Sequence, residues 1–384
     1  MNKIYDIFII GGGINGAGIA RDAAGRGLRV CIADKGEIGG ATSSWSTKLI
    51  HGGLRYLENY EFKLVKESLK ERDVILNIAP NITKIIPFII PHSNKLRPAW
   101  LIRIGMFLYD YLGGKTVVPK SKKINLIKEY PNLLKDKFTK GFQYYDVQVD
   151  DKKLTQLNAQ DAQKKSALIL ENIKVVNVKR FHDHWKIYLE NGLVITSTIL
   201  INAAGPWINE IVKNILKISS KKSIRLVKGS HIIINKLYEQ EVAFTLQNDD
   251  KRIVFVIPYK ESFSLIGTTE VEVDSPENPI ISKNEIQYLL SIVNNYFQKQ
   301  IDETDIIETY AGIRPLIEDF KEASKVTRDY IFDLNVESNL APLLNIYGGK
   351  LTTYRILSEK VLDELKYFLP RNIGKPWTDK KTLI

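Results

Sequence analysis

The 384-residue chain is poor in the residues that build disulfide frameworks, metal clusters and membrane spans. Its single cysteine excludes a disulfide framework, a thiolate cluster and a paired redox motif, and it favours a reducing compartment. Its five histidines are scattered, so we expect no metal site. No run of about 18 apolar residues is present that could span a bilayer. We therefore expect a globular protein that is cytoplasmic or lies on a membrane surface.

Acidic residues are also in deficit. The chain has 55 Lys and Arg against 44 Asp and Glu, which gives a formal net charge of +11. Such an excess allows nucleic acid, anionic lipid or an anionic substrate as partner. The cations are dispersed and are not interleaved with aromatic residues on a recognisable module, so we expect no nucleic-acid partner. The length and the 44% hydrophobic content suffice for two domains with their own cores.

The N-terminal segment has the pattern of a βαβ unit. A β-rich apolar run at 4–10 stops at three glycines, a helix-compatible stretch continues to about residue 27, and a second strand is predicted at 28–34. Apolar residues at helical spacing predict an amphipathic helix over 60–78, which Pro80 ends.

The rest of the chain alternates between strand and helix patterns. Period-two patterns predict antiparallel strands, and helical spacing predicts helices. An apolar run that stops at Gly348 predicts the last strand. The predicted strands are 174–181, 185–190, 193–201, 232–234, 253–258, 264–268 and 343–347, and the predicted helices are 283–300 and 351–368. This order indicates a nucleotide-binding α/β domain assembled from distant pieces of chain and interrupted by a largely antiparallel domain.

A GxGxxG motif follows the first strand and opens the first helix. Gly11 permits the tight turn, Gly13 lets a pyrophosphate approach the backbone, and Gly16 lets the helix pack on the strand. Asp34, at the end of the second strand, can accept hydrogen bonds from an adenosine ribose and would repel a 2′-phosphate. The motif therefore predicts a dinucleotide other than NADP and leaves NAD and FAD open.

Residues 41–56 add a hydroxyl-rich stretch followed by a basic, glycine-hinged one. Small hydroxylated side chains can line a diphosphate, while Gly52 and Gly53 allow the backbone to run close to a flat ring. A second glycine-bearing loop, 202–207, follows the strand at 193–201.

A family resemblance rests on motifs spread along the whole chain. Taken in order, they resemble those of the bacterial aerobic, FAD-dependent glycerol-3-phosphate dehydrogenases. The matching segments are 11–18, 41–44, 48–57, 96–100, 228–231, 267–269, 312–315 and 348–355.

The resemblance implies a fold and an activity. The fold class would be α/β and α+β, with a Rossmann-like FAD-binding domain (1–80, 145–215 and 305–370) and an inserted, mainly antiparallel β substrate domain (81–144 and 216–304). The family binds FAD non-covalently and oxidises sn-glycerol 3-phosphate to dihydroxyacetone phosphate by hydride transfer to flavin N5. It passes the electrons to membrane quinone from the cytoplasmic face of the cell membrane, where an anionic membrane surface is an expected partner.

The resemblance also assigns candidate residues. The cation cluster for a phosphate would include Arg55, Arg314, Arg328 and Lys350, with Tyr56 and Thr269 beside the substrate. The candidate cofactor-binding residues are Gly11, Gly13, Asn15, Gly16, Asp34, Thr42, Ser43, Ser44, Lys48, Leu49, Gly205, Gly312, Gly349, Leu351 and Thr352.

The catalytic base stays open between two histidines. His51 and His231 are the candidates for proton abstraction, and Arg314 or Lys350 could stabilise the alkoxide. An imidazole near its reference pKa acts as a base at neutral pH, but a lone histidine is as often a packed structural residue.

Other readings of the chain remain open. A related oxidase would pass electrons to oxygen, and a non-catalytic FAD-binding remnant would bind the cofactor without turnover. The family's helical C-terminal domain is expected to be absent, since the sequence stops at Ile384, and homodimer formation is left open. The aromatic and basic segment 96–112 suits either a membrane interface or a core helix.

Overall fold

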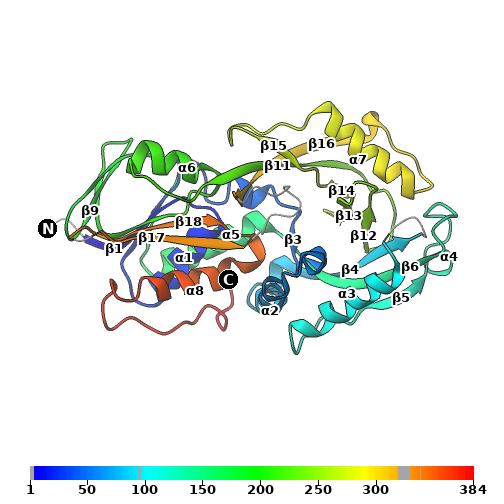
Figure 1. Ribbon diagram of the computed structural model, residues 1–384, viewed down its shortest axis with the longest axis horizontal. Helices are drawn as coiled ribbons and strands as arrows, with labels where there is room; N and C mark the ends of the chain where they lie inside the picture. Colours follow the sequence, from blue (N-terminus) through cyan, green and yellow to red (C-terminus); the bar gives the residue numbers. More distant parts are fainter. Residues whose placement is uncertain (1–3, 94–96, 319–328, 338) are drawn as a thin grey trace.

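The computed structural model describes residues 4–93, 97–318, 329–337 and 339–384. Two sheets form two lobes that lie side by side along the long axis of the molecule (Figure 1). The first lobe is built from both ends and from the middle of the chain, and the second from strands between residues 49 and 317, so the lobes do not correspond to an N-terminal half and a C-terminal half.

The first sheet is a parallel core with antiparallel edges. Its strand order is β17-β18-β10-β1-β2-β7, and β9 joins β10 to β8. Strands β18, β10, β1, β2 and β7 run parallel, whereas β17, β9 and β8 pair antiparallel. The bounds are β1 Ile4–Ile10, β2 Val30–Ala33, β7 Leu168–Leu170, β8 Val175–Arg180, β9 Trp185–Leu189, β10 Val194–Asn202, β17 Tyr330–Asn335 and β18 Leu343–Gly348.

Helices α1 (Ile14–Gly25), α5 (Asp151–Lys164) and α8 (Tyr354–Glu364) pack together on this sheet (Figure 1). Apolar residues of α1 and α8 share one buried core with β1, β2, β10 and β18. A second core packs Trp185 of β9 against the opposite face with the short helix α6 (Ile208–Glu210) and the π-helical turn Ile211–Leu216. Both faces of the parallel strands are thus covered, as their continuous apolar character requires.

The second sheet is almost entirely antiparallel. Its order is β15-β11-β14-β13-β12-β4-β6-β3, with β16 paired to β11 and β5 to β6. Only the β12–β4 pair within the described residues is parallel. The bounds are β3 Leu49–Ile50, β4 Thr83–His92, β5 Lys122–Asn125, β6 Lys140–Val149, β11 Ile224–Asn235, β12 Ala243–Gln247, β13 Ile253–Tyr259, β14 Phe263–Gly267, β15 Val271–Val273 and β16 Ile306–Ile317.

Four helices accompany this second sheet: α2 (Phe62–Ile78), α3 (Ala99–Leu112), α4 (Leu126–Glu129) and α7 (Lys283–Tyr296). Helix α7 packs on β11 to β14, and α2 with α3 packs against another core that includes β4 and β6 (Figure 1). Among the described residues, no helix is both long and apolar enough to cross a membrane.

The structure confirms the predicted fold class and the N-terminal βαβ unit. The predicted helix at 351–368 differs in detail, because a 3-10 turn at Leu351–Thr353 precedes α8 and the helix ends at Glu364. The helix predicted at 283–300 ends at Tyr296.

The predicted domain bounds stay a prediction. Two strands nevertheless belong to the other sheet. The prediction assigned β16 and β3 to the FAD-binding part, but β16 pairs with β11 and β3 pairs with β6, both in the second sheet.

Candidate functional site

A cavity of about 500 Å³ lies where the two sheets meet. From the first sheet it is lined by residues at the carboxyl ends of β1, β2, β10 and β18, and from the second by Gly229 of β11 and by Gly312 and Arg314 of β16. Open α/β sheets bind ligands at this edge, outside the carboxyl ends of their parallel strands.

The glycine motif closes one wall of the cavity. Gly11 has a left-handed φ of +104°, and a Cβ there would lie 2.6 Å from the carbonyl oxygen of Ala203. A Cβ on Gly16 would lie 1.9 Å from the carbonyl oxygen of Gly11, so this glycine allows α1 to start against the end of β1. Glycine is therefore required at both positions for steric reasons.

The hydroxyl-rich segment lies against the start of α1. The backbone N–H of Ile14 donates to Ser43 Oγ at 2.9 Å, and Thr42 Oγ1 donates to the Ile313 carbonyl at 2.7 Å. Thr42 and Ser43 both line the cavity. A helix N-terminus with a hydroxyl beside it favours an anionic group such as a diphosphate.

Asp34 stands at the end of the cavity that β2 lines. Its Oδ2 accepts the N–H of Gly12 at 2.6 Å and its Oδ1 accepts that of Gly36 at 2.8 Å. Burial raises the pKa of the Asp34 carboxyl, and these two N–H groups oppose that shift. Each carboxylate oxygen can accept a further hydrogen bond, so Asp34 can hold the glycine loop and still bind a hydroxyl.

A polar clasp that the sequence did not indicate lies near the same end. Lys35 Nζ lies 2.6 Å from Glu277 Oε1 and 4.1 Å from the ring centroid of Trp207. The Trp207 indole N–H donates to the same carboxylate at 2.5 Å. Lys35 and Trp207 line the cavity from the first lobe, and Glu277 lies between β15 and α7 of the second.

The other end of the cavity is formed by the turn after β18. Gly348 and Gly349 have φ of +76° and +90°, and Asn15 Nδ2 donates to the Gly348 carbonyl at 3.4 Å. Asn15 Oδ1 is buried with no hydrogen-bond partner among the described residues. Thr352 Oγ1 lies 3.3 Å from both the N and the O of His51, which brings the loop at 49–53 against this turn.

Arg314 and Lys350 both line the cavity, and Lys350 lies in this turn. Arg314 Nη2 donates to Thr268 Oγ1 at 2.9 Å, and its Nη1 lies 3.5 Å from Glu270 Oε1. Lys350 Nζ lies 4.8 Å from the ring centroid of Tyr56. Lys350 makes this end cationic, and with Arg314 it suits the cavity to an anionic substrate.

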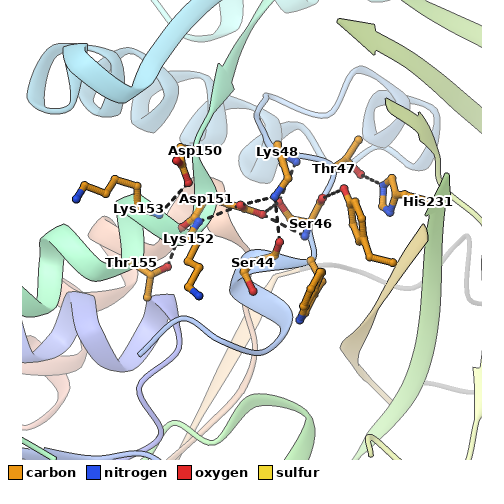
Figure 2. A network of polar contacts seen from close by, with 12 residues as sticks. Ser44, Ser46, Thr47, Lys48, Asp150, Asp151, Lys152, Lys153, Thr155 and His231 are labelled. Atoms are coloured by element: carbon orange, nitrogen blue, oxygen red, sulfur yellow. Dashed lines mark hydrogen bonds and ion pairs between the residues drawn. The ribbon is translucent and has the colours of Figure 1, made fainter. Parts of the chain in front are cut away.

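His231 lies behind the cavity wall. Its side chain is 1% exposed and stacks on Tyr310 with ring centroids 4.7 Å apart. Its Nε2 lies 3.1 Å from Thr47 Oγ1 (Figure 2), and the lining within the described residues includes Thr47 but not His231. Burial, with the charges of Arg314 and Lys48, holds the pKa of His231 well below 6.5, so the ring is neutral at neutral pH.

Lys48 is part of a buried ion pair beside the cavity. Its Nζ lies 2.7 Å from Asp151 Oδ1 and donates to the Ser44 carbonyl at 3.0 Å (Figure 2). Ser46 Oγ donates to Asp151 Oδ2 at 2.7 Å. Asp151 is the first residue of α5, so this pair ties the hydroxyl-rich segment to the first lobe. In the sequence, the acidic pair 150–151 is the feature that could have indicated this network. The pair lies about a hundred positions after Lys48.

The cavity gathers most of the predicted residues. Those that line it are Gly11, Gly13, Asn15, Asp34, Thr42, Ser43, Leu49, His51, Tyr56, Gly205, Gly312, Arg314, Gly349, Lys350, Leu351 and Thr352. Their individual roles stay predictions.

The other predicted residues lie elsewhere. Thr269 donates to Glu285 Oε1 at 2.6 Å in a buried network, and Ser44 Oγ donates to the Ala41 carbonyl at 3.0 Å. Gly16, Lys48 and His231 contact the wall from behind, and Arg55 is half-buried in the 3-10 segment Leu54–Asn59. Arg328 falls outside the described residues.

The cavity residues fit an FAD molecule. The lining runs from Asp34 past the glycine motif and Ser43 to the turn at 348–352, an order that suits ribose, diphosphate and ring. Gly11, Gly13, Gly348 and Gly349 line this path and have no side chain to cover the backbone. Asn15 Oδ1 is a buried acceptor without a donor in the described part of the chain.

Residues 6–353 match the family model of FAD dependent oxidoreductases. The chain belongs to this family. FAD is accordingly its cofactor.

Two curated relatives are similar over nearly the whole chain. The glycerol-3-phosphate dehydrogenase of Pseudomonas aeruginosa is 46% identical over 99% of this chain and 75% of its own length. The D-erythritol 1-phosphate dehydrogenase of Brucella abortus is 45% identical over 97% of this chain and 76% of its own length. These matches confirm the resemblance that the motifs indicated.

A solved structure agrees. The glycerol-3-phosphate dehydrogenase of Bacillus halodurans, complexed with FAD, superposes with a TM-score of 0.75 at 25% identity, covering 98% of this chain and 67% of the other.

Proposed function

We propose that this FAD-dependent oxidoreductase oxidises sn-glycerol 3-phosphate to dihydroxyacetone phosphate. The observation that carries the proposal is that Arg314, Lys350 and His51 all line one cavity. The names of the Pseudomonas and Bacillus relatives support a phosphorylated polyol as substrate. FAD supplies, when bound, an acceptor at flavin N5 for the hydride that leaves C2.

The protein side chains bind the phosphate and handle the proton. Arg314 is oriented by Thr268 and Glu270, and a guanidinium held in this way still offers donors to phosphate oxygens. Lys350 adds a point charge that binds phosphate or stabilises the alkoxide. His51 lines the cavity and can accept the proton directly, whereas His231 reaches the cavity through the Thr47 hydroxyl.

Anaerobic flavin reduction tests the proposal. The FAD-loaded protein should lose its oxidised flavin absorbance when glycerol 3-phosphate is added. An oxidised flavin that persists would refute it and would favour a non-catalytic remnant. Peroxide formation under air, stoichiometric with substrate, would favour the oxidase instead.

D-erythritol 1-phosphate is a second candidate substrate. The Brucella relative named for it is 45% identical to this chain, against 46% for the glycerol-3-phosphate dehydrogenase of Pseudomonas aeruginosa. Both compounds are phosphate monoesters of a polyol and need the same cationic end. The ratio of kcat/KM for the two compounds, measured with one acceptor dye, decides between them.

A membrane quinone is the electron acceptor that we propose, with the protein attached peripherally to the cytoplasmic face. Helix α3 supports this placement, because Trp100 and Phe107 are 64% and 61% exposed and Ile104 lies on the same outer surface. Exposed aromatic and aliphatic side chains on a basic protein suit an anionic interface. Co-sedimentation with vesicles of anionic lipid, lost on substitution of Trp100 and Phe107 by Ser, tests it.

The domain assignment and the assembly state complete the proposal. We assign FAD binding chiefly to the first lobe and substrate binding chiefly to the second, with the cavity between them, and keep a homodimer as the candidate assembly. Sedimentation equilibrium of the FAD-loaded chain tests the assembly.

A further inference from the structure

The hydroxyl of Tyr109 belongs to a buried polar cluster to which the proposed reaction assigns no role. Tyr109 lies on α3 and is 4% exposed. The N–H of Gly52 donates to its hydroxyl at 2.7 Å, and the hydroxyl donates to Asp146 Oδ2 of β6 at 2.7 Å. Arg72 of α2 donates to the same carboxylate at 3.1 Å. A chain of hydrogen bonds thus joins α2, α3 and β6 to the backbone at Gly52.

Gly52 adjoins residues that line the cavity. His51 precedes it, Tyr56 follows four positions later, and both line the cationic end. A Cβ on Gly52 would lie 2.5 Å from Leu69 Cδ2 and 2.7 Å from the Tyr109 ring, so the backbone is tightly enclosed. Thr352 holds the His51 backbone from the cavity side and Tyr109 holds the next peptide from outside.

We propose that Tyr109 is a positioning residue: its hydroxyl, oriented by Asp146, holds the Gly52 backbone and thereby sets how His51 and Tyr56 face the cavity. Without the hydroxyl, the Gly52 N–H would be buried without an acceptor, which drives the backbone to rearrange. Displacements of about 1 Å at a reacting group can cost roughly 100-fold in rate.

Tyr109→Phe and Tyr144→Phe form a matched pair. Tyr144 lies in the same core, is also 4% exposed, and its ring centroid is 5.9 Å from that of Tyr109. Its hydroxyl lies 3.1 Å from Thr245 Oγ1. Each variant loses one buried hydroxyl, but only Tyr109 contacts Gly52. Thermal midpoint, visible circular dichroism of bound FAD, kcat and KM are measured on each FAD-loaded protein.

We expect Tyr109→Phe to lower kcat at least tenfold and to alter the flavin circular dichroism, while Tyr144→Phe shifts only the thermal midpoint. Equal kcat and equal dichroism in the two variants would overturn the inference. The kinetic readout rests on the proposed function, but the dichroism does not. A wild type inactive on glycerol 3-phosphate would refute the proposed function and leave the dichroism to decide the inference.

A second variant covers the case in which Tyr109→Phe does not fold. Asp146→Asn keeps an acceptor for the Tyr109 hydroxyl but weakens its orientation by Arg72. It should change kcat and the flavin dichroism in the same direction by a smaller factor. Values equal to those of the wild type would count against the inference.

Discussion

Arg314 combines a fixed guanidinium with a place in the cavity wall. Thr268 and Glu270 hold it from one side, and Gly229 lies so close that a Cβ there would be 2.7 Å from Nη2. A residue held in this way binds an oxyanion with little further loss of side-chain entropy.

Arg314→Lys should lower kcat/KM for the phosphorylated substrate by about 10- to 100-fold, because lysine keeps the charge but loses the planar fork. Steady-state dye reduction measures this change. Arg225→Lys is the control, since Arg225 lies on β11 and pairs with Glu272 at 2.9 Å outside the cavity lining. Equal losses in both variants would contradict a role in substrate binding.

His231 should make the folded protein less stable as the pH falls. Its folded-state pKa lies well below 6.5, so the unfolded chain binds more protons below about pH 6.5 and unfolding is favoured there. The slope from this group reaches at most about 1.4 kcal/mol per pH unit. His231→Gln should flatten the change of thermal midpoint between pH 7.5 and roughly 5.5. An unchanged profile would mean that the pKa of His231 is not lowered in the folded state.

At the level of elements, α7 is anchored by its first turn. Ser282 and Glu285 form a capping box, and the Glu285 carboxylate also accepts from Ser230 and Thr269 and pairs with Lys228 at 2.8 Å. These donors outweigh desolvation, so the pKa of Glu285 falls to about 2. The helix is thereby tied to β11 beneath the cavity.

Glu285→Gln should lower the free energy of unfolding by about 1–3 kcal/mol at pH 7. Because the folded pKa is depressed, the stabilisation is present above about pH 4.5 and is lost as the pH falls toward 2. The difference from wild type should therefore shrink in urea titrations at pH 4. Glu239→Gln, at an exposed carboxylate that pairs with Lys236, should stay within about 0.5 kcal/mol of wild type.

For the molecule as a whole, the contact between the lobes at the β2 end of the cavity depends on the clasp of Lys35, Trp207 and Glu277. Glu277→Gln should speed FAD release by up to about fivefold at low salt, since an exposed pair contributes roughly 1 kcal/mol at most. Release is followed by flavin fluorescence after dilution. Glu241→Gln, at an exposed pair with Lys84 elsewhere on the second lobe, is the control. Equal rates of FAD release from both variants would show that the clasp does not help to retain the cofactor.

Some elements could not be predicted because their residues are buried on more than one side. In β16, residues 310–313 are all buried, so the alternation that marks a half-exposed strand is missing. Strand β4 carries Pro87 and Pro91 yet pairs along its length with β6, although proline argues against a strand between two neighbours.

The sequence by itself determined the βαβ unit, the glycine turns and the family, because these depend on neighbouring residues and on backbone sterics. Only the tertiary structure decided which candidates meet. It pairs Lys48 with Asp151, places Thr47 between His231 and the cavity, and brings Tyr109 to Gly52. The physical reason is that burial and hydrogen-bond partners come from segments 50 to 200 positions apart. No local pattern carries that information.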